Sequence, residues 1–319
     1  MPGLTTYTKP LTAEQARKLR GLLQESGWEF QTKPYCLYAA AHGKVNVLVY
    51  EKGPKIVVQG KDTEEFVTNV LEPQVLGVAE LGYEEVHHPE MFEPHIGVDE
   101  SGKGDFFGPL VIAGVHVDRE AVLALRAIGA VDSKKIGTDA KIAKLAEAIR
   151  QVPGLRWEVI QIGPAKYNEL YQKFGNLNRL LAWGHAKVIE TLLERVPECK
   201  KAISDQFANP AVLKRALQTR GRDIELIQRT KAESDPAVAA ASILARDRFV
   251  QWLDQTSQRL QIELPKGVSA QVKANARALF KRDGLDGLAA AAKMHFKTAA
   301  EVTGAPLPPD GPTEDGIMR

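Results

Sequence analysis

Two adjacent carboxylates, Asp99 and Glu100, are the residues best suited to chemistry in this 319-residue chain. They follow a short apolar run that begins at Ile96, and they lead into glycines at positions 102, 104 and 108. A strand that carries polar groups to its end and then turns on glycine is a common way to build a site in α/β proteins. Adjacent ionised carboxylates repel each other unless a cation or a proton holds them, so the pair favours a metal ion.

The same segment satisfies most of the phosphate-loop pattern G-x-x-x-x-G-K, between Gly97 and Lys103. The next residue is Gly104, where that pattern needs the Ser or Thr hydroxyl that binds Mg²⁺. The two carboxylates would also lie inside a cradle that should present backbone N–H groups to phosphate. We therefore do not interpret this segment as a nucleotide-binding loop.

Two further acids stand in comparable places along the chain. Asp205 follows the apolar strand pattern K-A-I-S, and Glu233 precedes a predicted helix in T-K-A-E-S-D-P. Strand ends converge on one edge of a sheet, so acids far apart in sequence can share a site there. An oxygen-only ligand set suits Mg²⁺ or Mn²⁺, and two such ions would support phosphodiester hydrolysis. The alternative for each isolated acid is a helix cap or a solvated side chain, and the pattern alone does not join Asp205 and Glu233 to the pair.

The net charge of +2 divides unevenly along the chain. Residues 1–90 carry about three more acids than bases, and residues 91–304 about seven more bases than acids. A basic domain with acids at its strand ends suits a polyanionic substrate. The sequence contains no apolar run long enough to span a membrane and no secretory signal, and Cys36 and Cys199 match no metal-ligand spacing. We therefore expect a cytoplasmic protein with reduced thiols.

The elements that must position these acids fall into two predicted domains. Residues 1–72 form a small α+β domain, with a capping box at Thr12 and Gln15, a meander of three strands and a second short helix. The predicted strands are 35–39, 45–50 and 56–59. Residues 73–94 are a predicted linker, and residues 305–319 a predicted tail.

Residues 95–304 alternate strands with helices, which predicts an α/β domain with a mixed sheet covered by helices. We expect strands at 96–98, 110–117, 157–162, 202–204 and 224–228, and helices at 119–127, 139–151, 164–173, 178–196, 236–253, 269–282 and 285–294. Asp235 is the predicted N-cap of the 236–253 helix. His185 is expected in a helix, as a surface or core residue, and Lys293 on a solvated basic face.

Five blocks of the sequence, in order, resemble the type 2 ribonucleases H and their bacterial HIII form in particular. They are G-V-D-E-S-G-K-G-D-F-F-G-P-L-V, V-D-S-K-K-I, G-N-L-N-R-L-L-A-W-G-H, S-D-Q-F and T-K-A-E-S-D-P-A-V-A-A-A-S-I-L-A-R. The resemblance implies a ribonuclease-H-like fold and a divalent-metal endonuclease. Such an enzyme cuts the RNA strand of RNA–DNA hybrids and leaves 3′-hydroxyl and 5′-phosphate ends. The catalytic and metal-binding roles implied by the resemblance fall on Asp99, Glu100, Asp205 and Glu233.

The block T-K-A-E-S separates two forms of the family, because ribonuclease HII has the approximate pattern G-D-A-K-S there. In this chain Lys231 and Glu233 have exchanged sign, which is the HIII form. The HII turn G-R-G is also replaced by Gly102-Lys103-Gly104, whose glycines would let backbone groups approach a ribose. We therefore expect cleavage within runs of ribonucleotides. Activity at single embedded ribonucleotides, as in HII, and a non-catalytic hybrid-binding module are the alternatives.

The resemblance also implies contacts with the substrate outside the carboxylates. It implies a TATA-binding-protein-like N-terminal domain that grips the hybrid through an exposed sheet face, and we expect a monomer. Asn176 and Asn178 precede a long helix, and we expect them to cap it, with a phosphate contact as the alternative. The expected substrate-binding residues are Ser101, Gly102, Lys103, Gly104, Ser133, Lys134, Asn176 and Asn178.

Overall fold

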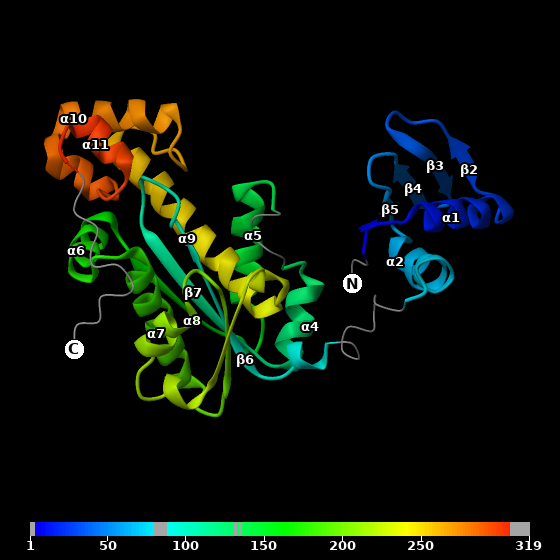
Figure 1. Cartoon of the computed structure of the whole chain (residues 1–319), viewed down its shortest axis with the longest axis horizontal. Helices are drawn as coiled ribbons and strands as arrows, with labels where there is room; N and C mark the ends of the chain where they lie inside the picture. Colours follow the sequence, from blue (N-terminus) through cyan, green and yellow to red (C-terminus); the bar gives the residue numbers. More distant parts are fainter. Residues whose placement is uncertain (1–3, 79–87, 131–132, 134–135, 307–319) are drawn as a thin grey trace. The chain divides into compact units, whose positions relative to one another are not determined.

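The computed structural model describes residues 4–78, 88–130, 133 and 136–306, which form two compact units (Figure 1). Unit 1 covers Met1–Glu90 and unit 2 covers Met91–Arg319. Each unit contains a five-stranded sheet with helices. The predicted fold class is therefore confirmed. Within the described ranges, no helix is both long and apolar enough to cross a membrane.

The helices of unit 1 begin where the sequence supplies their caps. Helix α1 (Ala13–Glu25) starts with the predicted capping box, in which Thr12 and Gln15 exchange hydrogen bonds. Helix α2 (Thr63–Phe66) continues as a π-helix over Val67–Leu76. Both helical segments contribute buried apolar side chains to one core with the sheet.

The sheet of unit 1 is antiparallel in the order β1-β5-β4-β3-β2. Its centre is the predicted meander, formed by β3 (Cys36–His42), β4 (Val45–Tyr50) and β5 (Lys55–Gly60). The edge strands β1 (Thr6–Pro10) and β2 (Glu29–Gln31) were not expected. Both are short, and their residues are mostly exposed, so the sequence lacks the apolar run that would indicate a strand.

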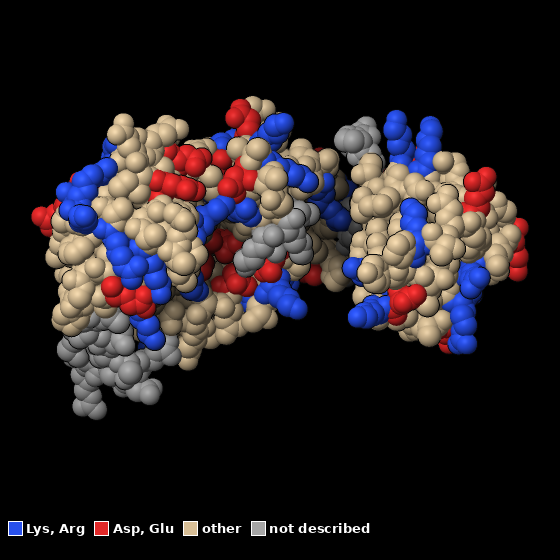
Figure 2. Space-filling model, turned by 90° about the horizontal axis from the view of Figure 1, so that it is seen from above, with Lys and Arg blue, Asp and Glu red and all other residues tan. Residues whose placement is uncertain are grey.

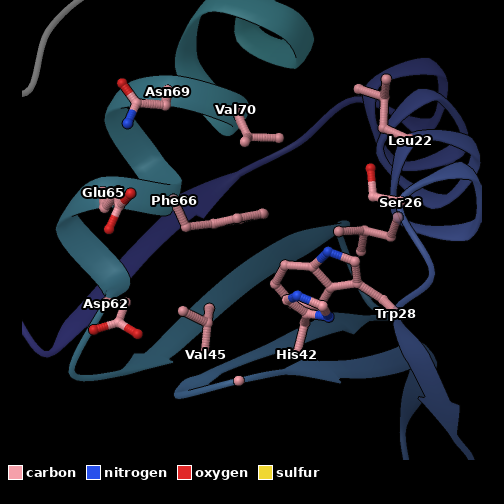
Figure 3. Close-up of a pocket in the computed structure, with 12 residues that line it drawn as sticks. Leu22, Ser26, Trp28, His42, Val45, Asp62, Glu65, Phe66, Asn69 and Val70 are labelled. Carbon is pink, nitrogen blue, oxygen red and sulfur yellow. The ribbon is translucent and has the colours of Figure 1, made fainter.

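One face of this sheet is covered by helices, and a cavity of about 460 Å³ opens on that side (Figure 3). Trp28 lies in it with its ring centroid 5.0 Å from that of Phe66 and 5.6 Å from that of His42. On the opposite face, cross-strand neighbours form a row whose members do not belong to the core shared with the helices. This row is Thr8, Val57, Leu48 and Ala39. In this row Thr8 is exposed, Val57 and Leu48 are half-buried and Ala39 is buried, so the second face of the sheet is partly open.

The sheet of unit 2 is mixed, in the order β10-β9-β6-β7-β8. Strand β6 (His95–Ser101) is central, pairs antiparallel with β7 (Leu110–Val117) and is parallel to β9 (Lys201–Asp205). Strand β8 (Arg156–Ile162) pairs with β7, and β10 (Glu225–Arg229) pairs with β9. The parallel strands β6, β9 and β10 therefore end on the same edge of the sheet.

Helices cover both faces of this sheet with two separate apolar clusters (Figure 1). One cluster joins the sheet to α4 (Arg119–Ala127), α5 (Asp139–Arg150), α9 (Pro236–Leu260), α10 (Ala270–Ala291) and α11 (Lys297–Thr303). The other joins it to α6 (Pro164–Phe174), α7 (Leu177–Arg195) and α8 (Pro210–Ala216). The short helices α8 and α11 were not expected, and α10 contains a non-helical Gly284 between its two halves.

Gly97 in β6 allows α9 to lie directly on the strand. A Cβ atom at this position would lie 2.3 Å from the backbone N of Val238 and 2.4 Å from the carbonyl C of Ala237. The start of α9 is further fixed by Asp235, the predicted N-cap, whose Oδ1 accepts from the N–H groups of Ala237 and Val238. Asp235 also pairs with His95 at 3.0 Å, and both side chains are fully buried. The strand that carries Asp99 is thus held to α9 at two points.

Replacing Gly97 with Ala should destabilise the protein by more than about 2 kcal/mol, because the new methyl group would collide with backbone atoms that cannot rotate away. Urea unfolding of the full chain measures this change. The matched control is Gly137→Ala, since a Cβ there meets nothing within 4 Å. That variant should stay within about 1 kcal/mol of the wild type. Equal stability of the two variants would contradict the close contact.

Candidate active site

Three predicted acids share the sheet edge where β6 and β9 end. In the parallel register Val98 is opposite Ser204, so Asp99 and Asp205 follow on neighbouring strands and on the same face. Arg229 in β10 is the register partner of Asp205, which extends the row by one cation. Glu100 points to the opposite face, as alternation along a strand requires. The structure therefore places Asp99, Glu100 and Asp205 at the ends of two neighbouring strands, with Glu100 on the other face of β6.

Glu233 is brought to this edge by a short helical turn between β10 and α9. The 3₁₀ turn Ala232–Ser234 follows Lys231, whose φ of 58° is unusual for a residue with a side chain. The Ala232 N–H donates to Asp205 Oδ1 at 3.3 Å. Glu233 therefore follows directly after Ala232, the residue that is hydrogen-bonded to Asp205.

Glu100 has two cationic or hydrogen-bonding neighbours. His185 Nε2 lies 3.0 Å from Glu100 Oε2, and Lys103 Nζ lies 3.3 Å from Glu100 Oε1. Burial alone would raise the pKa of Glu100, but the hydrogen bonds and electrostatic attraction of His185 and Lys103 hold this pKa below its usual value. These two neighbours therefore favour the ionised form of a carboxylate that is only 10% exposed.

His185 is the functional neighbour that sequence reasoning did not assign to the site. It lies on α7, is fully buried, and its Nδ1 is 3.1 Å from Ser204 Oγ. Phe207, two residues after Asp205, packs its ring 4.8 Å from the His185 ring and 5.6 Å from Lys103 Nζ. The available signal was a polar residue within the apolar stripe of a helix, at helical spacing from Leu181 and Val188.

The donor set fits a hard divalent cation. The side chains at this edge offer carboxylate oxygens, and the ammonium group of Lys103 already takes the place of a cation next to Glu100 Oε1. Within the described ranges, no three Asp, Glu, His or Cys side chains lie close enough to enclose an ion.

The turn after β6 is built from glycines and held by a distant lysine. Gly102 has a φ of 86°, and a Cβ atom there would lie 2.2 Å from the carbonyl O of Pro109. Lys293 Nζ donates to the carbonyl oxygens of Asp105, Phe107 and Gly108 at 2.8, 3.3 and 2.7 Å. The expectation that Lys293 lies on a solvated face is wrong, because it is fully buried.

The remaining predicted substrate contacts are dispersed. Ser101 and Lys103 are partly exposed near the carboxylates, and Gly104 has open space around its Cα. Ser133 is buried, with its hydroxyl 2.6 Å from Ser242 Oγ. Lys134 lies outside the described residues.

The two asparagines lie at the start of α7. Asn176 caps this helix by accepting from the Asn178 N–H at 2.7 Å. Both asparagines line a cavity of about 170 Å³ together with Arg179, Val212 and Arg215. The predicted cap is therefore confirmed, and the same residues border a basic cavity.

A mixed five-stranded sheet of this order, with acids at the ends of adjacent strands, is typical of the ribonuclease H class of nucleases. The family model for ribonuclease HII matches residues 96–299, which cover most of unit 2. The chain belongs to the ribonuclease HII family, the type 2 ribonucleases H, and within it to the ribonuclease HIII group.

The assignment to the HIII group comes from relatives that match almost the whole chain. The ribonuclease HIII of Protochlamydia amoebophila is 41% identical over 304 residues, 95% of this chain and 99% of the relative. That of Chlamydia pneumoniae is 43% identical over 297 residues, 93% of this chain and 97% of the relative. The crystal structure of Bst-RNase HIII in complex with Mn²⁺ superposes with a TM-score of 0.65 at 26% identity, over 94% of this chain and 98% of the other. The resemblance inferred from the five blocks is confirmed, and the chain is an endoribonuclease.

The stability contributed by Lys293 should depend on pH. Burial lowers the pKa of Lys293 to about 7, against an attraction from Asp105 that raises it. Above pH 7 the folded protein has therefore lost a proton that the unfolded chain keeps up to pH about 10.4. The free energy of unfolding should rise between pH 7.5 and 9, by at most about 1.4 kcal/mol per pH unit from this group, and Lys293→Met should lack that slope.

Urea unfolding of both proteins across this pH range measures the difference. Lys297→Met is the matched control, because Lys297 is an exposed lysine nearby. Its pH dependence should follow that of the wild type. Parallel curves for the wild type and Lys293→Met would contradict the assignment.

Proposed function

We propose that this chain hydrolyses the RNA strand of RNA–DNA hybrids with Mg²⁺ or Mn²⁺ and leaves 3′-hydroxyl and 5′-phosphate ends. The observation that carries the proposal is the row that places Asp99 beside Asp205, with Glu100 next to them on β6. Membership of the ribonuclease HIII group supports an RNA–DNA hybrid as the substrate. The Mn²⁺ complex of Bst-RNase HIII supports a divalent metal ion as the cofactor.

Asp99, Glu100, Asp205 and Glu233 would hold the metal ions. When bound, divalent ions supply Lewis-acid stabilisation of the charge that develops on a phosphodiester and lower the pKa of water. The protein residues fix where this happens. Asp99 Oδ1 accepts from the backbone N–H of Glu100 at 2.8 Å, so the Asp99 carboxylate is held against the backbone of the next residue. The N–H of Ala232 restrains Asp205 in the same way.

The turn Ser101-Gly102-Lys103-Gly104 would read the RNA strand. Gly104 leaves open space beside its backbone, so N–H and C=O groups could approach a ribose and its 2′-hydroxyl. Lys103 is 37% exposed and carries a flexible point charge, which suits a phosphate.

The cavity at the start of α7 would bind a backbone phosphate. Arg179 and Arg215 line it with Asn176 and Asn178, and none of its described lining residues is acidic. The N-terminus of a helix of 19 residues adds a favourable dipole for an anion. In Figure 2 basic and acidic side chains are interspersed on the visible face of unit 2. Basic groups close to acids suit a metal-dependent enzyme that binds a polyanion.

Unit 1 would grip the hybrid through its open sheet face. This face carries the row Thr8, Val57, Leu48 and Ala39, and Leu37 on the same sheet is 48% exposed. Apolar side chains on a sheet can pack against a shallow groove of a duplex, while lysines at its margin contact phosphates. The hybrid would therefore be bound at the catalytic edge and at a second surface.

The first test is a cleavage assay on a labelled RNA–DNA hybrid with Mg²⁺, Mn²⁺ or EDTA. The wild type should cut only with a divalent ion and yield 5′-phosphate ends. Asp99→Asn should lower the rate at least 1000-fold, because the row would lose one of its two adjacent charges. Binding of the hybrid by Asp99→Asn should persist. A wild type that binds the hybrid but never cuts it would instead identify a binding module.

The second test concerns the preferred substrate. A duplex with four or more consecutive ribonucleotides should be cut at least 10-fold faster than one with a single embedded ribonucleotide, because Lys103 offers no planar fork to fix one ribose. Initial rates at equal duplex concentration measure the ratio. Lys103→Arg is the informative companion variant, and equal rates on both duplexes by the wild type would contradict the prediction.

A further inference from the structure

His185 holds one oxygen of Glu100 and leaves the other facing the site. His185 Nε2 lies at hydrogen-bond distance, 3.0 Å, from Glu100 Oε2. Glu100 Oε1 is contacted by Lys103, whose ammonium group is flexible and partly exposed. The two oxygens of this carboxylate therefore have different partners: one fixed and buried, the other exchangeable.

The imidazole ring itself has no freedom to move. It is fully buried, and Phe207 packs against it with a centroid distance of 4.8 Å. Its Nδ1 lies 3.1 Å from Ser204 Oγ, and Ser204 Oγ is also 3.1 Å from the carbonyl O of Asp205. A histidine held on both ring nitrogens has a defined ring orientation.

We propose that His185 is a positioning residue, which fixes Glu100 relative to the strand that carries Asp205. The proposal rests on the function proposed above, because Glu100 matters only if it binds the metal. The contacts run from Glu100 on β6 through His185 on α7 to Ser204 on β9. They therefore set the separation of Glu100 and Asp205 independently of the hydrogen bonds between the strands. Groups that hold a metal ligand in this way commonly change metal affinity 10- to 100-fold when they are lost.

The side chains that could replace histidine allow a sharp test. In glutamine, the amide nitrogen is as many bonds from the backbone as Nε2 is in histidine, so His185→Gln can still donate to Glu100. In asparagine, the amide nitrogen corresponds to Nδ1, so His185→Asn can reach Ser204 but not Glu100. Both are neutral amides in the same buried place, and a general loss of packing would affect them alike.

The experiment measures Mn²⁺ binding to the full chain without nucleic acid, by the electron paramagnetic resonance signal of free Mn²⁺. His185→Asn should weaken the binding 10- to 100-fold, and His185→Gln should stay within about threefold of the wild type. The apparent Mn²⁺ requirement for hybrid cleavage should shift by the same factors, with the maximal rate at saturating metal much less affected.

His116→Gln is the matched control, because His116 on β7 is also a buried histidine of unit 2, and its Nε2 has no hydrogen-bond partner among the described residues. This variant should bind Mn²⁺ like the wild type. Mn²⁺ affinity of His185→Asn within twofold of the wild type, or equal losses in His185→Asn and His185→Gln, would overturn the positioning role. A wild type that neither binds Mn²⁺ nor cleaves the hybrid would instead refute the proposed function.

Discussion

The direct contact between α9 and β6 is the constraint on which the rest of unit 2 depends. It exists because Gly97 has no side chain where the backbone of Val238 passes. Asp99 lies two residues after Gly97 on β6. Glu233 and Asp235 lie in the segment that leads into α9. The buried pair of His95 and Asp235 holds the same junction from the other side. Breaking such a pair leaves an unpartnered buried charge, which is strongly unfavourable.

The electrostatics of the site follow from placing acids on neighbouring strands. Asp99 and Asp205 lie in one row, and Glu100 lies on the other face of β6. Lys103 is the cation in contact with Glu100, His185 lies at hydrogen-bond distance from the other oxygen of that carboxylate, and Arg229 is the strand-register partner of Asp205. These three neighbours come from three different parts of the chain. A divalent ion would then compete with Lys103 for one oxygen of Glu100.

The sequence was sufficient for those features that local chemistry determines. The Thr12 capping box, the Asp235 N-cap and the alternation of strands and helices were all predicted, since each depends on residues a few positions apart. The acids at the ends of β6 and β9 were predicted because strand ends converge. The edge strands β1 and β2 were missed, because mostly exposed strands have no apolar run.

The long-range partners could not be predicted in the same way. His185 is 85 residues from Glu100, and a histidine within an apolar helix stripe is equally compatible with an ordinary core residue. Lys293 was misplaced because lysine is mostly exposed, and nothing near it indicates that three carbonyl groups of a distant turn surround it. Such contacts depend on how separate elements meet, and periodicity along one element does not contain that information.

The bond between Lys293 and the turn at 105–108 also has a consequence for the order of synthesis. On the ribosome, β6 and its turn emerge almost 200 residues before the lysine that completes their hydrogen bonding. The three carbonyl groups receive the hydrogen bonds of Lys293 only after α10 has been synthesised. The turn therefore reaches its final shape only when nearly the whole chain has been made. A nascent chain truncated before residue 293 would carry the four carboxylates but not the finished turn, which ties nuclease competence to completion of the polypeptide.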